Sequence, residues 1–331
     1  MKLGVDVFSL RFNDWNAFEL LEYAHRVGLD VVHFSDMSSF ESTEIGFLRD
    51  VKRRADELGI GIEVGMDSIC PTSTRFSPER GTVVDQLTEM LNIAAELGSP
   101  ALRCYLGSMD DRRSDLPMDA HCVAVVANLR EIRSMAMDLN VKIAIENHAG
   151  DLQGGELARL IDAAGPDFVG ACIDAGNPLW VAESPFVTLE KLAPHVLMSH
   201  VRDSAVWPHP EGAVIQWVAM GEGTIDIEAW SKAYIAACPN TNFTLEIITS
   251  ISPRVVDFMN EDFWEVFPET TASEFTRFLK LVQTGRPYTA PVLTANWSAM
   301  LPEVRKAIAL QQQDKLAKSV RYCREVLGVG E

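Results

Sequence analysis

The chain has 331 residues, of which 47% are hydrophobic and 23% are charged, and its formal net charge at pH 7 is -18. This length suits one large α/β barrel or two smaller domains. The acidic charge excludes general binding to nucleic acid or to anionic membranes, and no segment is long and apolar enough to span a bilayer.

Short apolar runs alternate with segments of helical period along the chain. The runs that we predict as strands are LGVDVF (3–8), VVHFS (31–35), IGIEVGM (60–66), ALRCY (101–105), KIAIEN (142–147), FVGACID (168–174), VLMSHV (196–201) and FTLEII (243–248). The segments that we predict as helices are 15–26, 45–58, 83–97, 120–139, 155–164, 187–192, 227–237 and 272–284. Glycines at 28, 59, 98 and 165 follow helical stretches as stop signals.

Eight strand–helix alternations predict an α/β fold with a parallel sheet. Eight units suit a closed (β/α)8 (TIM) barrel, which we place at residues 1–285 as the catalytic domain. The alternative is an open doubly wound sheet, but no G-x-G-x-x-G follows the first strand. Residues 286–331 are first rich in proline and aromatic residues and then form a predicted helix, 303–327. We interpret them as a C-terminal helical extension that packs on the barrel or on a partner subunit.

Metal-competent side chains close four consecutive predicted strands. Strands five to eight carry, in order, Glu146, Asp174, His200 and Glu246 near their ends, and active sites of TIM barrels lie at the carboxyl ends of the strands. Taken singly, each has an ordinary explanation, such as a solvated carboxylate, a turn former or a histidine at the rim. Together they predict one divalent metal ion, with Mn²⁺ or Mg²⁺ favoured and Co²⁺, Fe²⁺ or Zn²⁺ as alternatives, because three carboxylates buried without a cation are costly.

Five motifs carry a resemblance to a known family. They are IENH (145–148), IDAGNP (173–178), SHVRD (199–203), GEGTID (221–226) and TLEI (244–247). Through them residues 1–285 resemble the xylose isomerase-like TIM-barrel superfamily of sugar isomerases and epimerases. The resemblance implies that Glu146, Asp174, His200 and Glu246 bind the metal and that the two glutamates also transfer protons. Asn177 departs from the pattern, because sugar epimerases usually have a histidine there.

The predicted function is that of a metal-dependent sugar isomerase or epimerase. A divalent ion that holds a sugar carbonyl and the neighbouring hydroxyl acidifies the adjacent C–H and stabilises the enediolate that forms. Glu146 and Glu246 come from different strands, so they can act as base and acid on opposite faces.

His148 supports an alternative function. In an extended chain it points to the same side as Glu146, where it can serve as a base or can orient Glu146. Within the resemblance, some branches with a histidine here are lyases or deglycosidases that cleave oxidised (3-keto) C- or O-glycosides by β-elimination. Such enzymes depend on a partner oxidoreductase, and the C-glycoside enzymes pair with a small second subunit. A non-enzymatic sugar-binding barrel and an endonuclease are further alternatives.

Several other polar residues are candidate contacts to a sugar or glycoside substrate, and a structural role is equally expected for each: Arg103, Arg202, His33, Glu63, Asn177 and Glu222. The long loop 203–223 is the candidate specificity element. Trp15, Trp180, Trp207 and Trp217 can form apolar walls or core. Six scattered cysteines without a C-x-x-C pair favour a cytoplasmic location, and the extension favours a homo-oligomer.

Overall fold

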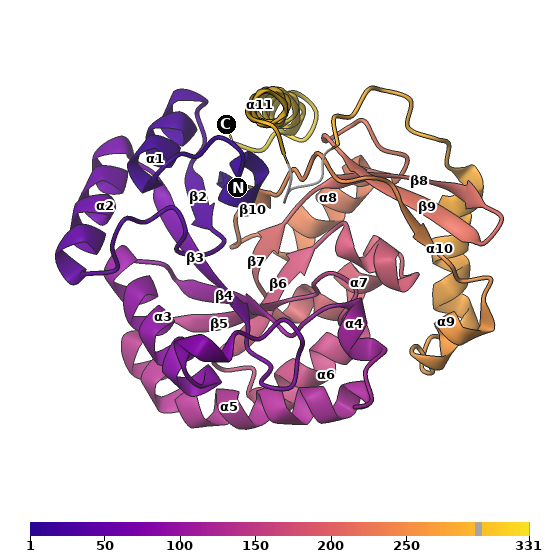
Figure 1. The fold of residues 1–331 in the computed structure, drawn as a ribbon, viewed down its shortest axis with the longest axis horizontal. Helices are drawn as coiled ribbons and strands as arrows, with labels where there is room; N and C mark the ends of the chain where they lie inside the picture. Colours follow the sequence, from indigo (N-terminus) through magenta and orange to yellow (C-terminus); the bar gives the residue numbers. More distant parts are fainter. Residues whose placement is uncertain (295–299, 331) are drawn as a thin grey trace.

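Eight parallel strands form the barrel in the computed structural model, which describes residues 1–294 and 300–330 (Figure 1). The strands are β1 Leu3–Asp6, β2 Val31–Phe34, β3 Gly61–Ser68, β4 Ala101–Tyr105, β5 Lys142–Glu146, β6 Val169–Asp174, β7 Val196–His200 and β10 Phe243–Leu245. Their spatial order is β10-β1-β2-β3-β4-β5-β6-β7. The predicted (β/α)8 fold is therefore confirmed.

The barrel closes between β7 and β10. The backbone N–H of Val201 donates to the carbonyl of Thr244 at 2.8 Å, and the N–H of Glu246 donates to the carbonyl of Val201 at 3.0 Å. These parallel bonds bring the last strand back to the seventh. They also place Glu246 and His200 at neighbouring strand ends, which matters for the site described below.

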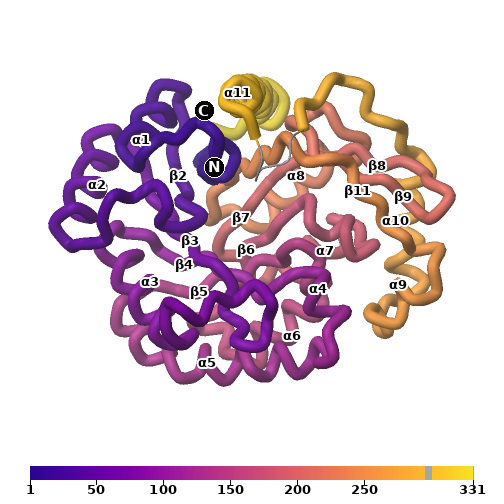
Figure 2. Tube along the Cα trace, in the orientation of Figure 1, coloured from indigo at the N-terminus to yellow at the C-terminus, as the bar shows by residue number. Residues whose placement is uncertain are grey.

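An outer ring of helices covers the barrel (Figure 2). Its members are α1 Ala17–Arg26, α2 Ile45–Leu58, α3 Val83–Leu97, α5 Met118–Leu139, α6 Gly154–Ala164, α7 Pro185–Leu192, α8 Ile227–Ala237 and α10 Ala272–Thr284, with the short helices α4 Met109–Arg112 and α9 Glu261–Glu265. Helix α3 shows why the boundaries fall where they do. Thr82 and Asp85 form a capping box at its start, and Gly98 ends it at φ 73°. None of the described helices meets the length and apolarity of a membrane span.

The sequence predicts a loop at residues 203–223, but most of this segment forms regular strands. Its residues form a hairpin of β8 Asp203–His209 and β9 Gly212–Val218, which β11 Arg254–Val256 extends into a three-stranded antiparallel sheet. In the segments SAVWPH and AVIQWV, apolar and polar residues partly alternate, as is typical of strands. The sequence analysis nevertheless treats both segments as parts of one loop. Gly212 adopts φ 146° at the turn, where an added Cβ would lie 2.2 Å from the Val256 carbonyl oxygen.

The extension contains one long helix, α11 Pro302–Glu325, which lies beside the N-terminal part of the barrel (Figure 1). Gln312 accepts a hydrogen bond from the N–H of Phe12 at 3.1 Å, and Ser319 accepts one from Met220 at 3.1 Å. The helix therefore packs on the barrel of its own chain. Residues 295–299 and 331 of the predicted extension lie outside the described part, and a role at a subunit interface stays a prediction.

Glu222 connects the extension to the loop after the hairpin. Its Oε2 atom accepts from Lys315 Nζ at 2.5 Å and from the Tyr288 hydroxyl at 2.5 Å, and Lys315 Nζ also lies 2.7 Å from that hydroxyl. Lys315 is only 6% exposed. The side chains of Glu222, Tyr288 and Lys315 therefore form a polar cluster in which each one hydrogen-bonds to the other two.

We predict that Lys315→Met destabilises the fold by about 1–3 kcal/mol, because Glu222 would lose its cation in a largely buried setting. Thermal or urea unfolding measures the change. The matched control is Lys318→Met on the same helix, whose partner Asp314 is exposed, so its effect stays within about 0.5 kcal/mol. Equal losses in the free energy of unfolding for the two variants would show that the polar cluster does not stabilise the packing of the extension on the barrel.

Candidate metal centre

Four side chains from neighbouring strand ends converge at one point of the barrel rim. They are Glu146 on β5, Asp174 on β6, His200 on β7 and Glu246 immediately after β10. One ligand atom of each lies within 4.8 Å of the others. The parallel register sets Asp174 opposite His200, and no member is more than 6% exposed. The four residues that the sequence placed at strand ends are thus brought together.

Glu146 is held from two sides. Its Oε2 atom accepts from Arg103 Nε at 2.6 Å and lies 3.3 Å from His200 Nδ1, while Oε1 accepts from Asn177 Nδ2 at 3.1 Å. Burial by itself raises the pKa of Glu146. The positive charges of Arg103 and His200 outweigh burial and hold the pKa well below its usual range. The carboxylate is therefore anionic and fixed in orientation.

Asp174 is held by a turn and by Arg202. Its Oδ1 atom accepts from the backbone N–H of Gly176 at 2.7 Å and of Asn177 at 2.6 Å, and Oδ2 pairs with Arg202. Asn147 bonds the backbone of Asp174 on both sides, through its Oδ1 at 2.9 Å and its Nδ2 at 3.1 Å. Burial raises the pKa of Asp174 to about 6, although Arg202 lowers it. The two bonds from the Asn147 side chain join the end of β5 to the end of β6.

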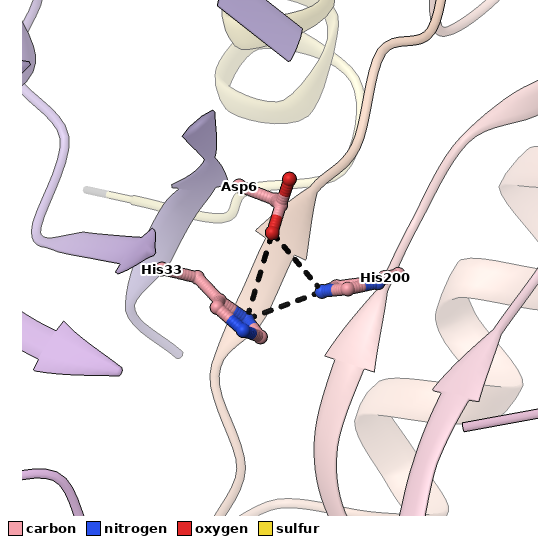
Figure 3. Close-up of side chains that lie close together, drawn as sticks. All are labelled: Asp6, His33 and His200. Atoms are coloured by element: carbon pink, nitrogen blue, oxygen red, sulfur yellow. Dashed lines mark hydrogen bonds and ion pairs between the residues drawn. The ribbon is translucent and has the colours of Figure 1, made fainter. Parts of the chain in front are cut away.

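The imidazole of His200 lies beside Asp6 and His33 (Figure 3) and also contacts the carboxylate cluster. Its Nδ1 atom is 3.3 Å from Glu146 and 3.6 Å from Glu246. Its Nε2 atom is 3.1 Å from His33 Nδ1 and 3.5 Å from Asp6 Oδ2. Burial lowers the pKa of His200, but the surrounding carboxylates outweigh burial and raise the pKa to about 9. This imidazole is thus set in a strongly anionic environment.

The contacts of His200 select which nitrogen can bind a metal. A metal ligand needs a lone pair on Nδ1, so the proton must be on Nε2. The Nδ1 atom of His33 is at hydrogen-bond distance to accept that proton, and Asp6 adds a negative charge beside it. Asp6 is itself held by the Ser35 hydroxyl at 2.8 Å. Asp6 and His33 therefore orient His200 with Nδ1 toward the carboxylates.

The arrangement fits a divalent cation. His200 Nδ1 and Glu246 Oε2 are buried and have no hydrogen-bond partner among the described residues, although Arg202 forms an ion pair with Glu246. These two atoms lie 3.6 Å apart, and with the carboxylates of Glu146 and Asp174 they make an oxygen-rich set with one nitrogen. Mn²⁺ and Mg²⁺ prefer such ligands, and Zn²⁺, Co²⁺ and Fe²⁺ accept them.

A cavity of about 460 Å³ lies against the cluster, and Glu246, Arg103, Arg202, Asn177 and His148 are among its lining residues. Its apolar wall comes from the stacked rings of Trp180 and Trp217, whose centroids are 4.6 Å apart. The guanidinium groups of Arg202 and Arg254 cover the outer faces of this pair. Trp217 belongs to the hairpin, so the hairpin contributes to the cavity wall, whereas Trp207 does not line this cavity.

His148 has one ring nitrogen, Nε2, for which the described residues provide no hydrogen-bond partner. Its Nδ1 atom is 2.9 Å from the carbonyl of Gly107, which requires a proton on Nδ1 and leaves the lone pair on Nε2. The ring stacks on Tyr105 with centroids 3.9 Å apart. Burial lowers the pKa of His148 to about 4, so the imidazole is neutral at pH 7. The side chain is held rigidly beside the cavity.

The remaining predicted substrate contacts lie away from the cavity. His33 and Glu63 are buried beneath the cluster, and Glu63 accepts from Asn242 at 2.6 Å and from Thr244 at 3.2 Å. Glu222 bonds to the extension, as described above. None of these three lines this cavity, and their roles in binding a substrate stay predictions. Sequence reasoning missed Asp6, which lies inside the predicted strand 3–8 but closes the observed strand β1; an acid near a strand end is the same signal that identified the four candidate ligands.

A family model described as a xylose isomerase-like TIM barrel matches residues 16–262. The chain is 24% identical over 217 residues to 3-oxo-isoapionate decarboxylase of Pectobacterium atrosepticum, which covers 63% of this chain and 70% of that protein. A solved structure of D-psicose 3-epimerase has a TM-score of 0.62 at 14% identity and covers 99% of this chain and 100% of its own. The E. coli 3-keto-D-glucoside 4-epimerase YcjR has a TM-score of 0.58 at 16% identity, covering 82% and 100%. These structural likenesses concern the fold.

We predict that His33→Leu weakens Mn²⁺ binding by about 10- to 100-fold, because His200 would lose the acceptor that keeps the proton on Nε2. The matched control is His33→Asn, which has nearly the same shape as leucine but retains an acceptor close to the position of Nδ1, so it should stay within about threefold of the wild type. Isothermal titration of the metal-free protein measures both affinities. Equal losses in the two variants would contradict the orienting role.

Proposed function

The chain belongs to the xylose isomerase-like TIM-barrel family, and on this premise we propose that it is a divalent-metal-dependent enzyme that isomerises or epimerises a sugar by proton transfer next to a carbonyl group. The observation that carries the proposal is the set of four buried ligand atoms within 4.8 Å of one another beside a cavity of about 460 Å³. We propose Mn²⁺ as the ion, since three carboxylates and one imidazole suit it.

The bound ion would polarise the substrate carbonyl and make the neighbouring C–H more acidic. The protein supplies the groups that move the proton. In this proposal Glu246, which lines the cavity, takes the proton from carbon. Glu146, buried at the end of β5, returns it from the other side. Arg103 and Arg202 hold these two carboxylates in place, and the Trp180–Trp217 wall excludes water from one side of the substrate.

We predict that the Mn²⁺-loaded protein exchanges solvent deuterium into one carbon of a free ketose, and that Glu146→Gln and Glu246→Gln each slow the exchange by about 100-fold or more. Proton NMR of D-fructose and D-tagatose incubated in D₂O measures the rate, and equilibrium dialysis measures bound Mn²⁺ in parallel. The control is Glu211→Gln at the exposed hairpin turn, which should exchange at the wild-type rate. Wild-type exchange in Glu146→Gln or in Glu246→Gln would contradict the assigned roles.

A second candidate function rests on the geometry of His148. The Gly107 carbonyl fixes the lone pair on Nε2, and the side chain lines the cavity. A base there can take the proton from C2 of a 3-keto glycoside. The electron pair of the broken C–H bond then forms the C1–C2 double bond, and the aglycone leaves C1 with its bonding pair and accepts a proton. Under this lyase function we propose an additional small partner subunit, and under the isomerase function a homo-oligomer.

We predict that His148→Ala discriminates the two functions. If the protein is a lyase, the variant retains Mn²⁺ but releases aglycone from a 3-keto glycoside about 100-fold more slowly or worse. Chromatography of the released aglycone and equilibrium dialysis of Mn²⁺ provide the two measurements. A variant that loses Mn²⁺ affinity at unchanged turnover would show that His148 orients Glu146 instead. Wild-type assays of ketoses and 3-keto glycosides in parallel complete the comparison.

A further inference from the structure

We propose that the substrate is an elongated glycoside whose second sugar ring binds in a cavity next to the metal centre. This inference rests on the proposed sugar chemistry and adds the substrate class. The second cavity, of about 500 Å³, lies between the 3₁₀ turn η1 Val7–Leu10, the start of α1 and the loop after β2. None of the four candidate metal ligands lines this second cavity.

The second cavity adjoins the first. Phe8, Ser35 and Asp36 line both cavities, and all three follow the carboxyl ends of β1 and β2. Both cavities are therefore on the catalytic rim of the barrel. Since a pocket of roughly 300–1,000 Å³ holds a drug-sized ligand, the two together offer more room than one sugar ring needs.

The lining of the second cavity combines aromatic faces with small polar groups. Trp15 is partly exposed and packs on Tyr23 with ring centroids 4.8 Å apart, and Phe40 lies across the same cavity. Asn16 and Glu41 provide an amide and a carboxylate at its edge. A sugar ring presents C–H faces that pack on aromatic rings and hydroxyl groups that bond to such polar edges. Asn16 accepts from the Glu19 N–H at 3.0 Å and donates to Glu41 at 3.5 Å, and each side chain keeps further hydrogen-bonding capacity for a sugar hydroxyl.

The charges favour an uncharged ring. The cation of Arg11 donates to the carbonyls of Phe8 at 2.8 Å and Thr249 at 2.7 Å, while Asp14 pairs with Arg305 at 2.9 Å. One oxygen of Asp36 accepts from the Ser38 N–H at 2.7 Å, and one oxygen of Glu41 accepts from Asn16 at 3.5 Å. The Asp36 and Glu41 carboxylates thus keep acceptor capacity for hydroxyl donors and would repel a phosphate or a sugar acid.

Isothermal titration of the Mn²⁺-loaded full chain with glucose, cellobiose and maltose tests the proposal. We expect at least one disaccharide to bind about tenfold or more tightly than glucose. Trp15→Ala should abolish that difference and leave glucose binding unchanged, and Glu41→Ala at an exposed position should reduce the difference several-fold. The matched control is Trp207→Ala, a partly exposed tryptophan outside both cavities, which should keep the full difference.

Equal affinity of the wild type for glucose and both disaccharides would overturn the proposal. It would also be overturned if Trp15→Ala and Glu41→Ala weakened glucose as much as the disaccharide. The experiments distinguish a failure of the proposed reaction from a failure of this inference. A preference for a disaccharide without deuterium exchange or aglycone release would refute only the reaction. Exchange into a ketose without any preference for a disaccharide would refute only the second binding cavity.

Discussion

The structure depends on how the barrel rim tolerates several buried negative charges at one point. Ionised carboxylates in a low-dielectric interior are costly unless cations compensate them. Two arginines supply part of the compensation, each by pairing with carboxylates of the cluster. His200 Nδ1 and Glu246 Oε2 have no hydrogen-bond partner among the described residues, and a divalent ion bound there would supply the remaining compensation. The carboxylates concerned, all buried, are Asp6, Glu63, Glu146, Asp174 and Glu246.

The barrel makes this concentration of charge rigid. Asn147 ties the end of β5 to the backbone of Asp174 on β6, and the bonds between Val201 and the segment around Leu245 tie β7 to β10. Each ligand therefore stands on a strand end whose neighbour is fixed by hydrogen bonds. Such a scaffold keeps the four candidate ligands close together without an ion, which would lower the cost of binding one.

Substrate selection is assigned to the segments that surround this rigid centre. The hairpin of β8 and β9 brings Trp217 to the cavity, and β11 brings Arg254 to the outer face of the tryptophan pair. On the opposite side, the segments after β1 and β2 form the second cavity. Helix α11 supports both sides, through Gln312 near Phe12 and through Lys315 near Glu222. Under the proposed function, the metal centre and the segments that select the substrate thus occupy different parts of the fold.

The sequence by itself determined the barrel and its four candidate ligands, because apolar periodicity and a polar residue at a strand end are local signals. The tertiary structure alone decided what those ligands touch. Asp6 and His33 reach His200 on β7 because β1 pairs with β10 and β2 pairs with β1 in the closed barrel. Glu222 contacts Lys315, which lies 93 residues further along the chain. The sequence did not predict the small sheet for the same reason, because β11, which pairs with β9 of the hairpin, follows β10 in the chain. Pairing between distant segments depends on chain closure, which no local pattern encodes.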